Sequence, residues 1–300
     1  AGLFEIPTCP LMLTQSAKAW LIASRPKTLP AAIVPVWAGC LMAWNLEGKF
    51  DLKLAVLTVL GAVFIQIATN FFNDVIDARK GADTAARVGP KRVTVSGLLS
   101  SRAVYFGAVL MLLLATACGA VLIQERGWAI VAIGIPSLYL SYGYTGGFFP
   151  LAYRGVGELF VILFFGLVAV IGTIFIQTGH WPFEGFLLGL QIGFLSAVLI
   201  AVNNYRDVEE DRAARKMTLA VRVGRPAVRW MIFVMTVAPS LLVLVLQGPS
   251  LWFLISFPLA LVFLLVEIKL LKPGGVSSAL LGVSALHLIL FVLAQNLGMG

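Results

Sequence analysis

The sequence predicts an all-α, polytopic membrane protein. Of its 300 residues, 60% are hydrophobic and only 12% are charged, which is far too apolar for an ordinary soluble protein. The apolar residues gather in runs that approach the roughly 20 residues a helix needs to cross a bilayer. The Lys and Arg residues fall mainly in the short segments between these runs. We therefore expect about nine transmembrane helices.

The N-terminal segment differs in character from the spans that follow it. Residues 14–27 combine Trp20 with Arg25 and Lys27, a composition typical of a helix that lies at the membrane interface. We interpret the whole chain, residues 1–300, as one transmembrane domain with two halves, about 28–150 and 151–300. The expected spans are 28–44, 52–73, 103–123, 128–144, 156–177, 183–205, 230–246, 251–268 and 277–295.

The distribution of basic residues predicts the orientation of the chain. Nineteen of the 22 Lys and Arg residues would lie on one side of the membrane if the spans alternate as proposed. By the positive-inside rule this side is the cytoplasm, so the N-terminus and the two most basic loops, 74–100 and 206–229, are expected there. The net charge of +8 follows from these loops and does not indicate nucleic-acid binding.

Two acidic stretches stand at the ends of the second and sixth spans. They are similar in pattern and lie 133 residues apart, measured between Asp74 and Asp207. Residues three or four positions apart share a face of a helix. Each stretch can therefore present one Asn and two Asp side chains together: Asn70, Asp74 and Asp77 in the first, and Asn203, Asp207 and Asp211 in the second.

Carboxylates beside an apolar bundle are costly unless they bind a cation. Mg²⁺ is the expected ion, since it takes a few carboxylates and completes its octahedron with water and phosphate oxygens. Both stretches lie beside clusters of Lys and Arg, which suits a diphosphate bridged by Mg²⁺ to the carboxylates. Because the neighbouring spans are apolar, a lipid diphosphate is the expected substrate. Aromatic side chains near the site, Tyr144 among them, could stabilise a cation left by departure of diphosphate.

Four segments resemble a known family. They are residues 19–30, with Arg-Pro-Lys-Thr-Leu-Pro at 25–30; residues 73–90, with Asn-Asp-Val-Ile-Asp at 73–77; residues 153–166, with Tyr-Arg-Gly-Val-Gly-Glu at 153–158; and residues 203–224, with Asn-Asn-Tyr-Arg-Asp at 203–207. In this order they resemble the UbiA superfamily of intramembrane prenyltransferases, and within it the 1,4-dihydroxy-2-naphthoate prenyltransferases. The resemblance covers about two thirds of the chain.

The resemblance implies nine transmembrane helices around a central cavity that opens near the cytoplasmic face. It implies Mg²⁺ held through a diphosphate by the four aspartates Asp74, Asp77, Asp207 and Asp211, with Asn70 and Asn203 supporting. By position, the diphosphate partners would be Lys91, Arg92, Arg206 and Lys216. The acceptor site or its entrance would contain Arg25, Lys27 and Tyr144.

The implied reaction is transfer of a prenyl group from a polyprenyl diphosphate to a small aromatic acid, in quinone biosynthesis. The resemblance favours 1,4-dihydroxy-2-naphthoate with loss of CO₂, while 4-hydroxybenzoate and homogentisate stay open as acceptors. A CDP-alcohol phosphatidyltransferase is a rival, but it would place its second aspartate pair soon after the first. An ion-coupled transporter is a rival of another class, and it would need polar groups at mid-membrane depth.

Overall fold

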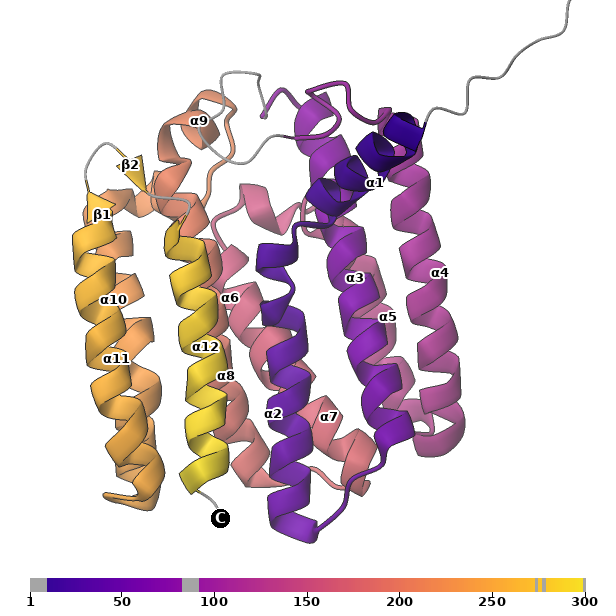
Figure 1. Cartoon of the computed structure of the whole chain (residues 1–300). Coiled ribbons are helices and arrows are strands. Elements are labelled where there is room, and N and C mark those ends of the chain that lie inside the picture. Colours follow the sequence, from indigo (N-terminus) through magenta and orange to yellow (C-terminus); the bar gives the residue numbers. More distant parts are fainter. Residues whose placement is uncertain (1–9, 83–91, 273–274, 277–278, 299–300) are drawn as a thin grey trace, which may run out of the picture.

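The computed structural model describes residues 10–82, 92–272, 275–276 and 279–298 and is helical apart from one short hairpin. Its long helices lie side by side in a bundle (Figure 1). The first half contains α1 (Pro10–Ser24), the 3₁₀ turn η1 (Pro26–Thr28), α2 (Pro30–Glu47), α3 (Leu52–Arg79), α4 (Ser101–Arg126) and α5 (Trp128–Gly143). The second half contains η2 (Leu151–Tyr153), α6 (Gly157–Val161), η3 (Ile162–Val168), α7 (Ala169–Thr178), α8 (Phe183–Arg206), α9 (Val208–Ala213), α10 (Leu219–Gln247), α11 (Leu251–Leu270), β1 (Leu271–Lys272), β2 (Gly275–Val276) and α12 (Ala279–Gly298).

The helices confirm an all-α integral membrane protein. Among the described residues, seven helices are long and apolar enough to cross a bilayer. Residues 15–28 and 30–47 meet at a bend of 52°, and they add an eighth span if they cross the bilayer together. The helix Trp128–Gly143 is also apolar, but it is shorter than these spans. The expected total of nine stays a prediction.

Both acidic stretches lie at the same end of the bundle. Figure 1 shows α1, α9 and the β1–β2 hairpin at this end, and the C-terminus at the other. We call it the α9 end. The chain turns from α1 into α2 at Arg25, whose φ of 50° places it in the left-handed region.

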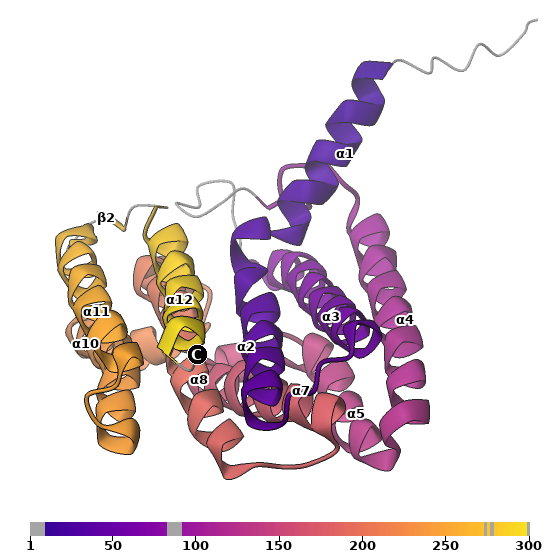
Figure 2. The same ribbon diagram turned by 60° about the horizontal axis from the view of Figure 1, so that its bottom comes forward.

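Close backbone contacts hold the middle of the bundle together. A Cβ atom placed on Gly166, in η3, would lie 2.4 Å from the carbonyl oxygen of Gly189 in α8. Small residues at helix crossings are typical of membrane proteins, where packing replaces much of the hydrophobic driving force. The outer helices α10 and α11 pack against α8 and α12, away from α3 and α4 (Figure 2).

The fifth predicted span, 156–177, is one continuous helical path with an unusual middle. α6 passes into η3, a seven-residue π-helical segment, and then into α7. In a π-helix the backbone hydrogen bonds run from i to i+5, so the segment accommodates more residues per turn than an α-helix. Phe160 and Phe164, at the start of this path, stack with ring centroids 4.6 Å apart.

Two predicted loops are wrong in their extent. The segment 74–100 begins as helix, because α3 continues to Arg79. The segment 206–229 contains α9 and the start of α10, where the Thr218 hydroxyl accepts a hydrogen bond from the Val221 N–H and so caps the first turn. Helical geometry is interrupted at Gly224, whose φ is 81°, two residues before Pro226. The hairpin β1–β2 was also not predicted.

Candidate active site

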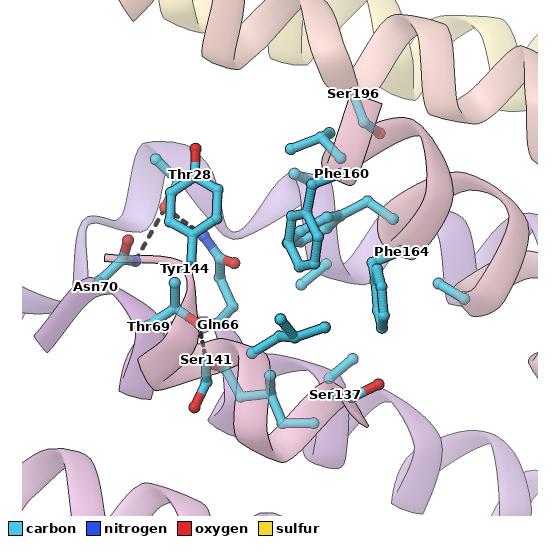
Figure 3. Close-up of a pocket in the computed structure, with 18 of the residues that line it drawn as sticks. Thr28, Gln66, Thr69, Asn70, Ser137, Ser141, Tyr144, Phe160, Phe164 and Ser196 are labelled. Atoms are coloured by element: carbon cyan, nitrogen blue, oxygen red, sulfur yellow. Dashed lines mark hydrogen bonds between the residues drawn. The ribbon is translucent and has the colours of Figure 1, made fainter. Parts of the chain in front are cut away.

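A cavity of about 820 Å³ lies inside the bundle and is lined by residues of both acidic stretches. Most of the cavity wall is aliphatic or aromatic. Figure 3 shows Thr28, Gln66 and Asn70 on one side of the pocket and Phe160 and Phe164 on the other. The cavity thus combines a charged end with a long apolar wall.

The first acidic stretch lies on α3, and its aspartates are buried. Asp74 and Asp77 are each 2% exposed. The Asp74 carboxylate accepts hydrogen bonds from the backbone N–H groups of Val93 at 3.2 Å and Thr94 at 3.1 Å, and also from the Thr94 hydroxyl. Asp74 therefore holds the turn that follows the first basic segment, in addition to lining the cavity.

Asp77 is the point where the two stretches meet. Its carboxylate accepts hydrogen bonds from the Tyr153 hydroxyl at 2.8 Å and the Lys216 ammonium at 3.1 Å. The Arg92 guanidinium lies 3.9 Å away. Lys216 also lies 3.9 Å from the Asp211 carboxylate. One ammonium group thus joins aspartates that are 134 positions apart in the sequence.

The second acidic stretch is not a single helix, which corrects the expectation. α8 ends at Arg206 and α9 begins at Val208, with Asp207 between them at φ −91° and ψ 12°. The i to i+4 hydrogen bonds nevertheless continue, from the Asp207 N–H to the Asn203 carbonyl and from the Asp211 N–H to the Asp207 carbonyl. The three side chains therefore keep the one-turn spacing that the sequence suggested, and all three line the cavity.

The Arg206 guanidinium forms an ion pair with Asp207, the next residue in the chain. Its Nε and Nη2 donate to the two Asp207 carboxylate oxygens at 2.5 and 2.9 Å. Both side chains are largely buried, so this bidentate ion pair is well shielded from water.

Burial shifts the pKa of two groups around Asp77. The pKa of Tyr153 is raised by burial and by the nearby Asp77 carboxylate, so its hydroxyl remains a donor. The pKa of Lys80 is lowered by burial, against the attraction of Asp77. The Lys80 ammonium lies over the Tyr153 ring at 4.0 Å and donates to the Thr145 carbonyl at 2.9 Å.

The remaining predicted site residues are placed as follows. Arg25 lines the cavity and donates from Nη2 to the Asn70 carbonyl at 3.5 Å. Lys27 is exposed but also lines the cavity, as does Tyr144, whose ring lies 5.5 Å from that of Phe160. Lys91 lies outside the described residues.

Several polar residues at the site were not predicted from the sequence as site residues. Tyr153 and Glu158 belong to a motif used only for the family resemblance. The Glu158 carboxylate accepts from the Asn204 amide at 2.8 Å, and Asn204 lines the cavity. Gln66 and Thr28 were not singled out, although Gln66 lies one turn before Asn70 and could have been found from that spacing.

The acidic residues fit Mg²⁺ only together with a ligand. Within the described ranges, no group of three or more His, Cys, Asp or Glu side chains could hold a metal unaided. The aspartates instead contact Lys216, Arg206 and Arg92. Mg²⁺ commonly binds through one or two carboxylates plus substrate phosphates, so the oxygen donors at the charged end fit the ion once phosphate oxygens are present.

Comparison with known proteins identifies the family. The UbiA prenyltransferase family model matches residues 32–291. The chain belongs to the UbiA prenyltransferase family. Among curated relatives of this UbiA protein, 1,4-dihydroxy-2-naphthoate octaprenyltransferase of Mycobacterium tuberculosis is 37% identical over 81% of this chain and 83% of the relative. The enzyme of the same name from Haemophilus influenzae is 34% identical over 71% of both chains.

Solved structures show the same fold. A UbiA homologue from Archaeoglobus fulgidus, bound to GPP and Mg²⁺, matches with a TM-score of 0.67 at 18% identity, covering 94% of this chain and 99% of that one. A UbiA homologue from Aeropyrum pernix matches with a TM-score of 0.64, also at 18% identity, covering 91% and 97%.

Proposed function

We propose that this UbiA protein transfers a prenyl group from a polyprenyl diphosphate to 1,4-dihydroxy-2-naphthoate in quinone biosynthesis, with Mg²⁺ as cofactor and with loss of CO₂. The observation that carries the proposal is the position of Lys216 between Asp77 and Asp211, at the charged end of a cavity whose wall is otherwise mostly apolar. The curated relatives that are named for this reaction support the choice of substrate.

The charged end would hold the diphosphate. Lys216, Arg92 and Arg206 can donate to its oxygens, and Lys91 is proposed for the same role by its position in the sequence. The four aspartates, supported by Asn70 and Asn203, would hold Mg²⁺ against the diphosphate. When bound, Mg²⁺ supplies positive charge that stabilises the departing diphosphate.

The apolar wall would hold the prenyl chain and the reactive carbon. Breaking the bond between this carbon and the diphosphate oxygen leaves both electrons on oxygen and an allylic cation on the chain. Tyr144 and Phe160 line the cavity, and the face of each ring could stabilise the cation by about 0.5–2 kcal/mol. The same wall excludes water, which would otherwise capture the cation.

The aromatic acceptor supplies the electrons for the new carbon–carbon bond. An electron-rich hydroxylated ring can attack the cation without a strong base. If the attacked carbon carries the carboxylate, loss of CO₂ restores the aromatic ring and returns the electron pair. The acceptor carboxylate needs a cation that is not occupied by diphosphate, and Arg25 or Lys27 at the cavity wall could supply it.

The experiment compares acceptors under identical conditions. Purified protein is supplied with one radiolabelled polyprenyl diphosphate, Mg²⁺ and either 1,4-dihydroxy-2-naphthoate, 4-hydroxybenzoate or homogentisate. We expect prenylation of the naphthoate, release of its labelled carboxylate as CO₂ in step, and no product with EDTA. Preference for another acceptor, or a product that retains the carboxylate, would contradict the substrate assignment. Absence of diphosphate release with every acceptor would contradict prenyl transfer itself.

The positive-inside rule supports a cytoplasmic position for the N-terminus and for the α9 end. Both substrates would then enter the charged end from the cytoplasmic side of the membrane.

A further inference from the structure

The hydroxyl group of Thr28 is fully used by its neighbours. It donates its one hydrogen to the Arg25 carbonyl oxygen at 2.9 Å. It accepts from the Asn70 side-chain nitrogen at 3.1 Å and from the Gln66 side-chain nitrogen at 3.3 Å. A hydroxyl has one hydrogen to donate and two lone pairs to accept with, so nothing remains for a further partner.

This arrangement fixes the orientation of both carboxamides. Because the Thr28 hydrogen is committed to Arg25, an amide oxygen placed against the hydroxyl would face only lone pairs. Gln66 and Asn70 must therefore turn their N–H groups to Thr28 and their carbonyl oxygens away from it (Figure 3). Asn70 uses its amide nitrogen twice, since it also donates to the Ser24 carbonyl at 2.9 Å.

The Gln66 carbonyl oxygen is left without a partner. The side chain is 8% exposed and lines the cavity, and among the described residues its Oε1 is buried and accepts no hydrogen bond. A buried acceptor without a donor is costly, whereas a ligand that brings a donor recovers the lost bond. The Gln66 oxygen therefore offers an acceptor to a ligand that carries a hydrogen-bond donor.

We propose that Gln66 is a specificity residue whose Oε1 accepts a hydrogen bond from a ring hydroxyl of the aromatic acceptor. The inference rests on the proposed function and deepens it. Diphosphate oxygens and the acceptor carboxylate would be repelled by a carbonyl oxygen, and a prenyl chain has no donor. Among the proposed organic ligands, a phenolic hydroxyl is the one group that brings a hydrogen-bond donor to the Gln66 oxygen.

The test compares the binding of related acceptors to matched variants. Gln66→Met keeps the length of the side chain and removes both polar atoms. Its KM for 1,4-dihydroxy-2-naphthoate should rise about tenfold, the loss expected for one buried hydrogen bond, while its KM for the prenyl diphosphate stays within about twofold. The control is Thr69→Val, because the Thr69 hydroxyl donates to Ile65 in its own helix at 2.8 Å; it should leave both constants within about twofold.

Two monohydroxy analogues identify the bond. 1-Hydroxy-2-naphthoate and 4-hydroxy-2-naphthoate are measured as competitive inhibitors, so that their own reactivity does not matter. In the wild type, the analogue that lacks the recognised hydroxyl should bind about tenfold more weakly than the other, and Gln66→Met should abolish this difference. Unchanged discrimination in Gln66→Met, or an equal rise in both KM values, would overturn the proposal.

A second pair of variants tests the orientation even if Gln66→Met does not fold. Thr28→Ser keeps the hydroxyl and should retain the discrimination, whereas Thr28→Val releases the Gln66 amide and should reduce it. Equal discrimination in these two variants would also overturn the proposal. A wild-type protein that is inactive on the naphthoate would contradict the proposed function. An active wild type with an unaffected Gln66→Met would contradict only the role of Gln66.

Discussion

Substitution of Gly166 by Ala should destabilise the protein by an amount that follows from its surroundings. The added Cβ would lie 2.4 Å from the Gly189 carbonyl oxygen, 2.5 Å from the Gly193 Cα and 2.9 Å from the Gly193 nitrogen. All three are backbone atoms, so no side chain can rotate away. Restoring contacts of about 3.5 Å requires η3 and α8 to separate by about 1 Å. Overpacking of this kind costs about 1–3 kcal/mol, and we expect the upper end.

The free energy of unfolding is measured by denaturant titration of purified protein in detergent. Gly282→Ala in α12 is the matched control, because its Cβ would meet nothing within 4 Å. Alanine favours helix over glycine by at most about 1 kcal/mol, so this variant should be unchanged or slightly stabilised. If Gly166→Ala unfolds at the same denaturant concentration as Gly282→Ala, the close approach of η3 and α8 is wrong.

Three further predictions concern the site and its surroundings. Asp74→Ala and Asp207→Ala should each lower turnover by on the order of 10²-fold, because each removes a carboxylate proposed to hold the Mg²⁺ that stabilises the departing diphosphate; near-normal turnover in a folded variant would contradict the proposed role of the two acidic stretches. A cysteine at position 215, in a background without Cys9, should react with a membrane-impermeant reagent only from the cytoplasmic side; labelling only from outside would reverse the topology. The raised pKa of Tyr153 keeps its phenol protonated in the folded state, while the unfolded phenol ionises near pH 10. The free energy of unfolding of the wild type should therefore fall more steeply above about pH 10 than that of Tyr153→Phe. Equal slopes of this free energy against pH in the two proteins would contradict the effect assigned to Tyr153.

The fold was predictable because the bilayer constrains the sequence so strongly. Runs of about 20 apolar residues leave little choice except membrane-spanning helices. Most predicted spans lie within a few residues of the observed helices, whereas α3 ends later and α10 begins earlier than predicted. The errors are in the polar segments. Thr218 starts a helix by capping it, and Gly224 bends it. These are local effects of single residues, which hydrophobic periodicity does not report.

The candidate site was predictable in composition but less so in geometry. The spacing of Asn and Asp located both acidic stretches, and the alternation of the spans with the distribution of Lys and Arg placed them on one side. It could not indicate that Asp74 holds the turn at Val93 and Thr94, or that Lys216 reaches Asp77 across the cavity. Such contacts depend on how helices from distant parts of the chain are placed. The spacing of Gln66, one turn before Asn70, could have pointed to the cavity, but the role of its side chain follows only from its partners.

The π-helical segment η3 is the one part of the fifth span where the loss of a residue could be absorbed locally. Phe160 before it and Thr173 after it both line the cavity, and Thr173 also packs so closely on Gly39 that a Cβ there would lie 2.7 Å away. Deleting one residue between positions 162 and 168 would restore α-helical winding. Because the wider turns of the π-helix already hold about one extra residue, the half of the span beyond it would keep nearly the same orientation. Thr173 would then stay on Gly39, whereas a deletion between residue 168 and Thr173 would turn Thr173 away from Gly39 by about 100°. A change of one residue should therefore be tolerated within η3 and excluded just after it.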